Sequence, residues 1–276
     1  MNTFHTAKVR SFTLHLQTIM QTTAVINHIT NWLKEYSNSC NSEGFVIGIS
    51  GGIDSAVTST LAAKTGLPLI CIEMPIHQQK SQIDRGQKHI NWLKEKFKNV
   101  SSSELDLTPI FDGFIAQLPS DKEKNEIALV NTRARLRMTA LYYFAQANNS
   151  LVVGTGNKVE DFGIGFFTKY GDGGVDISPI ADLLKTEVYI IGKELGVTND
   201  IIIAPPTDGL WGDDKTDEDQ IGATYPELEW AMNYNGDISN LSERKIKILA
   251  IYKKLNKANQ HKMKAIPVCK IPNNLK

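Results

Sequence analysis

The sequence predicts an α/β protein in which helices cover both faces of a doubly wound, mostly parallel β-sheet. Three observations predict this class. Short apolar runs that suit buried parallel strands recur along the chain, segments with helical spacing separate them, and a glycine-rich turn follows the first run. Strands that alternate with helices favour right-handed crossovers. We therefore expect one domain over residues 20–276, preceded by an N-terminal extension over 1–19 whose order the sequence leaves open.

The individual elements follow from local patterns. Apolar residues at helical spacing predict a helix over about 20–37, and FVIGIS after it predicts the first buried strand. DSAVTSTLAAKTG predicts a helix that ends at Gly66, and LPLICIEMP predicts the second strand. The later predicted elements are a helix over 81–98, a strand over about 100–107, a long helix over 123–148 and a strand at LVVGT from 151.

The composition argues against several classes of function. Thirty Lys and Arg balance 30 Asp and Glu among 276 residues, so no charge excess favours DNA, RNA or an anionic membrane as a partner. Three cysteines far apart in the sequence indicate neither a disulfide framework nor a zinc site. No stretch approaches the roughly 18 to 20 apolar residues of a membrane span, and the N-terminus lacks the apolar core of a signal peptide. We expect a cytoplasmic protein.

The most informative local pattern is GISGGIDS, which begins at Gly48 directly after the first predicted strand. A glycine-rich turn before a helix lets backbone N–H groups approach an anion, and the helix N-terminus adds partial positive charge, so phosphate is the expected ligand. Neither the Walker pattern nor the dinucleotide pattern GxGxxG fits. Asp54 would repel phosphates unless Mg²⁺ lay between them, and this ion prefers one or two carboxylates plus phosphate oxygens. The alternative is a tight turn in which Asp54 serves only the first helical turn.

The loop pattern SGGxDS resembles the pyrophosphate-binding loop (PP-loop) of the ATP pyrophosphatases, which cleave ATP between the α and β phosphates. The resemblance implies that the loop binds ATP, through Gly48, Ile49, Ser50, Gly51, Gly52, Ile53, Asp54 and Ser55. The loop alone indicates the superfamily and not the member, because GMP synthetases, argininosuccinate and asparagine synthetases and tRNA-modifying enzymes carry it as well.

A second stretch indicates the member. Residues 151–185 read LVVGTGNKVEDFGIGFFTKYGDGGVDISPIADLLK, and the series GTxxxxE, FFTKYGDGG, DIxP and a lysine resembles NAD synthetases. The likeness runs from about residue 45 to about residue 267 and implies a Rossmann-like fold of the adenine-nucleotide α-hydrolase type. It also implies ATP contacts from Thr155, Lys185 and Thr207. By the same likeness Glu160, which follows a predicted strand where open α/β sheets bind ligands, completes a metal site with Asp54; the alternative is a solvated helix residue.

The resemblance further implies a site for deamido-NAD. Aromatic residues in FFTKYGDGGVD suit a flat pyridine ring, although core packing is the alternative for each one alone. The family assigns to this substrate Arg135, Lys169, Asp176 and, just after the last helix, His261 and Lys262. In the helix over 123–148, Arg135 lies on a different flank from Arg133 and Arg137, beside a predicted core stripe of Ile127, Val130, Ala134, Met138, Leu141 and Ala145.

The implied function is that of an ammonia-dependent NAD synthetase, a ligase that forms a C–N bond. The nicotinate carboxylate attacks the α phosphorus of ATP to give an adenylated intermediate and pyrophosphate, and ammonia then releases NAD and AMP. The protein supplies placement, Mg²⁺, positive charge and exclusion of water, without a covalent nucleophile. The acidic segment 208–222, poor in apolar anchors, predicts a loop or a closing lid. Glutamine-using relatives carry an N-terminal amidase domain, and since the phosphate loop begins by Gly48, we expect ammonia as the nitrogen donor.

The long helix also predicts a homodimer. Leu129, Leu136 and Tyr143 recur every seven residues and point nearly opposite the core stripe. A helix that is apolar on two sides must be buried on two sides. Because NAD synthetases are homodimers, a symmetric helix-to-helix interface would cover the second side. The alternative is that the helix over 20–37 covers it within one subunit.

Two other functions fit parts of the sequence. The first is that of another ATP pyrophosphatase. A GMP synthetase, however, would need an added dimerisation domain, and a tRNA-modifying enzyme would need basic patches or cysteine pairs. The second is that of a nucleotide-binding sensor that performs no chemistry. Such a sensor would tolerate loss of the two metal carboxylates, and both are present.

The sequence departs from the family at MPIHQQKSQIDRGQKH, where relatives usually carry an acidic segment. The role of residues 75–90 is therefore left open.

Overall fold

The computed structural model of the chain describes residues 20–119, 125–206 and 216–276. In this part of the chain, parallel strands form a sheet in the order β3-β2-β1-β4, with the bounds Gly44–Gly48 (β1), Leu69–Glu73 (β2), Val100–Glu104 (β3) and Ser150–Val152 (β4). The predicted α/β class and parallel pairing are confirmed. The extension over 1–19 lies outside the described residues, and the single domain over 20–276 stays a prediction.

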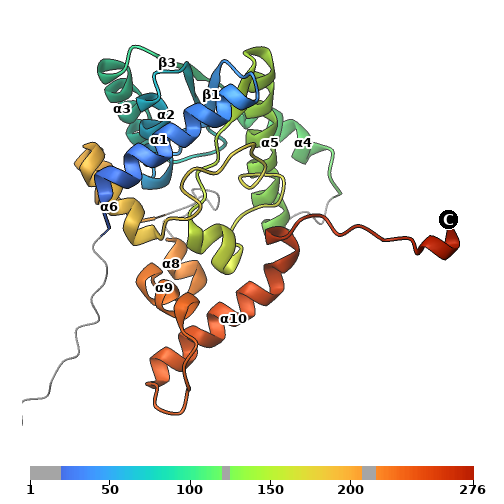
Figure 1. Cartoon of the computed structure of the whole chain (residues 1–276). Coiled ribbons are helices and arrows are strands. Elements are labelled where there is room, and N and C mark those ends of the chain that lie inside the picture. Colours follow the sequence, from blue (N-terminus) through green and yellow to red (C-terminus); the bar gives the residue numbers. More distant parts are fainter. Residues whose placement is uncertain (1–19, 120–124, 207–215) are drawn as a thin grey trace, which may run out of the picture.

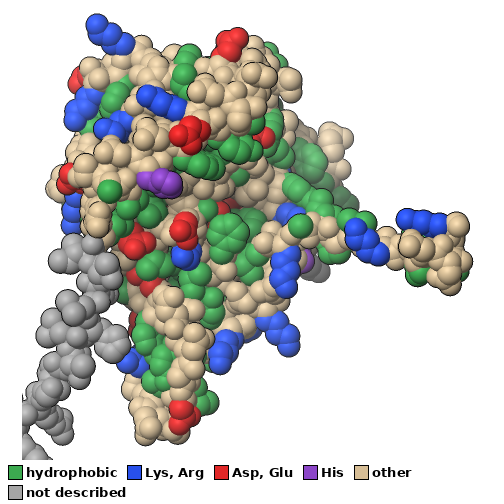
Figure 2. Space-filling view, in the orientation of Figure 1, with side chains coloured by type: hydrophobic (Ala, Val, Ile, Leu, Met, Phe, Trp, Pro, Cys, Tyr) green, Lys and Arg blue, Asp and Glu red, His purple; other side chains and the backbone are tan. Residues whose placement is uncertain are grey.

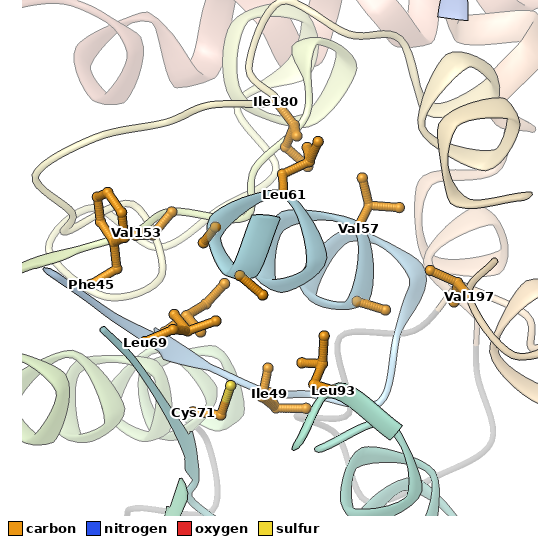
Figure 3. Packing of buried hydrophobic residues seen from close by; sticks show 14 of the residues in the cluster. Phe45, Ile49, Val57, Leu61, Leu69, Cys71, Leu93, Val153, Ile180 and Val197 are labelled. Carbon is orange, nitrogen blue, oxygen red and sulfur yellow. The ribbon is translucent and has the colours of Figure 1, made fainter. Parts of the chain in front are cut away.

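Helices cover both faces of the sheet because side chains of the central strands alternate in direction. Phe45 and Ile47 of β1 enter one apolar cluster, whereas Val46 between them enters the other. The first face is covered by α1 (Thr22–Ser39), α2 (Ile53–Lys64), α3 (Lys80–Lys96) and α6 (Lys185–Leu195). The second is covered by α4 (Thr108–Ala116) and α5 (Glu126–Ala147). Figure 3 shows the first cluster, with Val57 and Leu61 of α2 above the strand residues. The doubly wound arrangement is thus confirmed.

The strand order creates a crevice at the centre of the sheet. From β1 the chain extends the sheet through β2 to β3, and β4 then pairs with the opposite edge of β1. Open α/β sheets bind ligands where the strand order reverses, at the carboxyl ends of the strands. Here that position brings the glycine-rich loop after β1 next to the residues that follow β4.

A helical unit at the C-terminal end packs beside this crevice (Figure 1). Its apolar cluster joins η2, a π-helical segment (Val159–Ile164), to α9 (Tyr225–Asn233) and α10 (Glu243–Met263). The shorter elements are α7 (Asn199–Ile202), α8 (Asp217–Ile221) and the 3-10 helix η3 (Asn273–Leu275). Figure 2 shows Lys and Arg side chains along α10. Within the described residues, no helix has the length and apolar character that a membrane crossing requires.

Two predictions for this C-terminal part are wrong in detail. The segment 208–222 is not all loop, because α8 occupies its second half and is capped reciprocally by Thr216 and Asp219. Residues 207–215 lie outside the described residues, so the predicted lid is untested. His261 and Lys262 do not follow the last helix but form its last turn, since α10 continues to Met263.

The faces of α5 also differ from the prediction. Val130, Ala134 and Ala145 are buried, but Ile127 at the start of the helix is 66% exposed, so its place in the core stripe was wrong. Leu129 and Leu136 are half-buried against a cluster that includes Phe111 of α4, whereas Tyr143 is 70% exposed. The helix α1 packs against α2 and α6 on the other face, so the alternative that it covers this side of α5 is wrong.

Candidate active site

The glycine-rich loop leads from β1 into the N-terminus of α2. Gly51 adopts φ +78°, and a Cβ there would lie 2.6 Å from the carbonyl oxygen of Gln82 in α3, so both conformation and space require glycine. The Ser50 and Ser55 hydroxyls lie 3.0 Å apart, and the Gly52 N–H donates to Ser50 Oγ at 3.2 Å. On the outer side, Arg85 Nε of α3 donates to the Gly51 carbonyl oxygen at 3.3 Å. The loop is therefore fixed from both sides with the N-terminus of α2 open for a phosphate.

Three charged side chains meet beside this loop. Lys185 Nζ lies 2.6 Å from Asp54 Oδ2 and 3.0 Å from Glu160 Oε1. The lysine side chain is 3% exposed, and those of Asp54 and Glu160 are 18% and 16% exposed. Burial by itself would lower the pKa of Lys185, but the two carboxylates outweigh it and hold this pKa above its ordinary value. The ammonium is therefore charged.

Residues that sequence reasoning missed hold this charged cluster. The fully buried Asn157 donates from Nδ2 to Asp54 Oδ1 at 3.2 Å, while its Oδ1 accepts from the Glu160 N–H at 3.2 Å. Tyr225 Oη donates to Glu160 Oε1 and lies 3.4 Å from Asp217 Oδ2. Burial, followed by the charges of Glu160 and Asp217, raises the pKa of Tyr225, so the phenol keeps its proton and acts as the donor. Thr224 and Glu227 in ATYPELE signal a helix start, but no sequence signal shows that this hydroxyl reaches the site.

A cavity of about 250 Å³ opens at the charged cluster. Its polar wall contains most of the predicted ATP and metal residues: Gly48, Ile49, Ser50, Gly52, Ile53, Asp54, Ser55, Thr155, Glu160 and Lys185. Gly51 is not part of the wall and packs on α3 instead, and Thr207 lies outside the described residues. Apolar residues of the wall include Met138, Leu141, Phe166 and Phe167. The cavity therefore offers both charged groups and apolar surface to a ligand.

Arg137, not Arg135, is the arginine of α5 in the cavity wall. Its Nε donates to the carbonyl oxygen of Met74 at 2.9 Å, just past the end of β2. The helical periodicity of the sequence placed Arg135 and Arg137 on different flanks of the helix, but it could not show which of these flanks faces the cavity. That choice depends on how α5 is rotated over the sheet.

A further carboxyl in the cavity wall, that of half-buried Asp161, was not predicted from the sequence. Asp161 packs so closely on Gly156 that a Cβ there would lie 2.2 Å from Asp161 Oδ1. Burial, and then the charges of Glu160, Asp172 and Asp54, raises the pKa of Asp161 to about 8. At neutral pH this carboxyl is therefore mainly protonated.

The residues predicted for deamido-NAD form a second group around the FFTKYGDGG segment, outside the described cavity wall. Arg135 Nε and Nη2 both donate to the Lys169 carbonyl oxygen at 3.3 Å. Lys169 Nζ in turn donates to the His261 carbonyl oxygen at 2.8 Å. Lys262 Nζ donates to the Phe167 carbonyl oxygen at 2.7 Å and lies 5.1 Å from the centroid of that ring. The structure thus brings four of the five residues together.

The fifth, Asp176, makes bonds that support the sheet. Its Oδ2 accepts from the Val152 N–H at 2.8 Å at the end of β4, and its Oδ1 accepts from Tyr142 Oη at 3.0 Å. Both oxygens therefore have partners within the chain. A substrate contact by this carboxylate would have to share an oxygen with one of these donors.

The two carboxylates fit the predicted magnesium ion. The Lys185 ammonium lies between Asp54 and Glu160, so the space between them accommodates a cation. Among the described residues, no three His, Cys, Asp or Glu side chains converge as a metal site. A metal held here would take its other ligands from phosphate and water, which is the coordination that Mg²⁺ prefers at nucleotide sites.

Known proteins resemble this chain over most of its length. Residues 25–266 match the family model described as NAD synthase. A protein from Syntrophomonas wolfei named NH(3)-dependent NAD(+) synthetase is 38% identical over 93% of this chain and 100% of its own length. A protein of the same name from Saccharolobus solfataricus is 36% identical over 87% of this chain and 86% of its own length.

Two solved structures are similar along nearly the entire chain. The structure of NMN synthetase from Francisella tularensis has a TM-score of 0.79 and 33% identity, and it covers 92% of this chain and 99% of its own. NH3-dependent NAD synthetase from Campylobacter jejuni, solved with a nitrate ion, has a TM-score of 0.73 and 25% identity over 91% of this chain and 100% of its own. The fold and the order of its elements are therefore shared with both.

Proposed function

The chain belongs to the NAD synthase family, and we propose on this basis that it is an ammonia-dependent NAD synthetase that converts deamido-NAD to NAD. One observation carries the proposal: a relative named for this activity aligns over its entire length at 38% identity. The relatives are named NH(3)-dependent NAD(+) synthetase, and an enzyme that joins ammonia to a carboxyl group is a ligase that forms a C–N bond.

The reaction would proceed in two balanced steps. The nicotinate carboxylate attacks the α phosphorus of ATP, a P–O bond breaks, and pyrophosphate leaves with the electron pair. Ammonia then attacks the carbonyl carbon of the adenylated intermediate, AMP departs, and a proton is lost from nitrogen to give the amide. Neither step needs a covalent bond to the protein, so the chain acts by positioning and by stabilising charge.

The polar wall of the cavity suits the first step. The backbone N–H groups of the loop and the first turn of α2 would bind the phosphates, and Asp54 and Glu160 would hold Mg²⁺, which neutralises phosphate charge. Lys185 is paired with both carboxylates in the structure. In the reaction it would exchange one of these partners for a phosphate oxygen, where its ammonium stabilises the charge of the departing pyrophosphate.

The apolar residues of the wall suit the nicotinate ring and the second step. Phe166 and Phe167 would pack on the pyridine and keep water from the adenylated carbonyl, since water would hydrolyse it back to the acid. The group of Arg135, Lys169, His261 and Lys262 would bind the remainder of the substrate, together with Asp176. These roles rest on the family resemblance and on the grouping of the first four residues.

A second acid is a candidate substrate for the same reaction. The similar structure from Francisella tularensis is named NMN synthetase, so amidation of nicotinate mononucleotide competes with amidation of deamido-NAD. Both acids present the same nicotinate ribotide to the cavity. They differ in the adenylate half, which only deamido-NAD carries and which is separate from the nicotinate carboxyl group where bonds form and break.

One experiment tests the activity, the acid and the nitrogen donor together. Purified protein is incubated with ATP, Mg²⁺, ammonium and either deamido-NAD or nicotinate mononucleotide, and AMP, pyrophosphate and the amide are measured. We expect all three products in equal amounts, with a higher kcat/KM for deamido-NAD, and no amide when glutamine replaces ammonium. A higher kcat/KM for the mononucleotide would assign the second acid. Comparable rates with glutamine would contradict the proposed donor, and AMP formation without either amide would contradict the proposed function.

We further propose that the protein is a homodimer that associates through the exposed side of α4 and α5. Three large apolar side chains are exposed there, Ile110 and Phe114 of α4 and Tyr143 of α5. Exposed apolar side chains gathered on neighbouring elements are typical of interaction surfaces. Arg135 lies on the same helix, which would bring part of the substrate site close to the subunit boundary.

Replacing Tyr143 with glutamate should give a monomer with weakened binding of the acid substrate. Leu136→Glu should do the same, but Leu136 is half-buried on its own subunit, so Tyr143→Glu separates association from folding more cleanly. Sedimentation velocity measures the first effect and KM for the acid the second. The control is Ile238→Glu, which changes a residue 52% exposed in the C-terminal helical unit and should stay dimeric. A dimeric, fully active Tyr143→Glu variant would exclude this interface.

A further inference from the structure

Tyr225 contacts two members of the charged cluster at once. Its hydroxyl donates to Glu160 Oε1, and Lys185 Nζ lies 4.6 Å from the centroid of its ring. The proposed reaction gives this residue no role, and it does not belong to the described wall of the cavity. A tyrosine that touches both a metal carboxylate and a phosphate-binding lysine can nonetheless determine how they are arranged.

The C-terminal helical unit holds Tyr225 in place. Its side chain is 3% exposed within the apolar cluster of η2, α9 and α10. Its backbone N–H donates to Glu218 Oε1 at 2.8 Å, and it begins α9, whose first turn is closed by Thr224 and Glu227. Because both ring and backbone are fixed, the hydroxyl reaches Glu160 from one defined direction.

The contacts of Glu160 are unevenly distributed over its two oxygens. Tyr225 and Lys185 both donate to Oε1. Within the described part of the chain, Oε2 is thereby left for another ligand. Hydrogen bonds to the side chains that bind a metal orient them, and losing one lowers metal affinity or activity by about 10- to 100-fold.

We propose that Tyr225 is a positioning residue that holds Glu160 by Oε1, so that Oε2 can bind the divalent cation at the ATP phosphates. This inference rests on the proposed function, which supplies that cation. Glu160 on η2 and Tyr225 at the start of α9 both belong to the C-terminal helical unit, so the contact fixes the carboxylate that this unit contributes opposite Asp54 in the first turn of α2.

The test is Tyr225→Phe, which keeps the ring in its apolar cluster and over Lys185 but removes the hydroxyl. Mn²⁺ serves as the probe, and its binding in the presence of ATP and absence of the acid is measured by electron paramagnetic resonance. We expect about tenfold weaker Mn²⁺ binding, with KM for the acid unchanged. The control is Tyr234→Phe, which removes a hydroxyl that donates to the Asp237 carbonyl oxygen at 2.6 Å in the same helical unit. It should bind Mn²⁺ as the wild type does.

A double-mutant cycle distinguishes positioning from a merely structural role. If Tyr225 acts through Glu160, adding Tyr225→Phe to Glu160→Gln should cause no further loss of Mn²⁺ affinity. A lower melting temperature with wild-type Mn²⁺ affinity in Tyr225→Phe would overturn the inference, as would a full tenfold further loss in the Glu160→Gln background. Failure of the wild-type protein itself to bind Mn²⁺ with ATP would overturn the metal assignment, and this inference with it.

Discussion

Replacing Asp54 with asparagine is expected to lower turnover about a thousandfold, because a bound metal contributes several kcal/mol to transition-state stabilisation and about 1.4 kcal/mol changes a rate tenfold. Asparagine has the size of aspartate but lacks the charge that would hold Mg²⁺ against the phosphates. The variant should remain folded. Lys185 keeps Glu160 as a partner at 3.0 Å, and an asparagine oxygen can still accept from Asn157.

The measurement is kcat at saturating ATP, together with the melting temperature of the variant. The matched control is Asp182→Asn, because Asp182 also pairs with a lysine, Lys158, at 2.8 Å but is 97% exposed and does not line the cavity. The control should keep wild-type turnover. Turnover of Asp54→Asn within a few-fold of the wild type would remove Asp54 from the metal site.

Replacing Lys185 with methionine is expected to lower the free energy of unfolding by about 3 kcal/mol, because breaking a buried pair leaves its partners uncompensated. Methionine fills the space of the lysine stem but leaves Asp54 and Glu160 facing each other without a cation. Both are largely buried, so water screens their repulsion poorly. Turnover should fall by orders of magnitude as well, since the variant lacks the charge at the departing pyrophosphate.

Chemical denaturation with and without millimolar Mg²⁺ measures this effect. A divalent cation that binds between the two carboxylates replaces the lost ammonium, so Mg²⁺ should stabilise Lys185→Met more than the wild type. Lys158→Met is the control and should cost less than about 1 kcal/mol, because its ion pair with Asp182 is exposed. If Lys185→Met were as stable as the wild type, the buried pair would not hold the site together. If Mg²⁺ stabilised both proteins equally, the cation would not bind between these carboxylates.

The parts of the protein that could be predicted from its sequence are those governed by neighbouring residues. The run FVI before GISGGIDS indicated a buried strand, and the glycines indicated a close backbone approach, because strand burial and turn geometry depend on a few adjacent residues. The strands and most helices of the N-terminal half followed in the same way. Thr155, Glu160 and Lys185 were identified through the family resemblance, and all three line the cavity.

Only the tertiary structure decided which side chains meet. Periodicity defined the flanks of α5, but the rotation of that helix over the sheet turned Arg137 into the cavity wall and left Ile127 in solvent. Asn157 and Tyr225 lie 103 and 65 residues from the carboxylates that they hold. The charged cluster forms because the buried ammonium on α6 needs opposite charges within a few ångströms, and α2 and η2 supply them from distant parts of the chain. Local sequence determines the conformation of each segment, whereas the contacts between distant polar groups depend on how the apolar clusters pack those segments together.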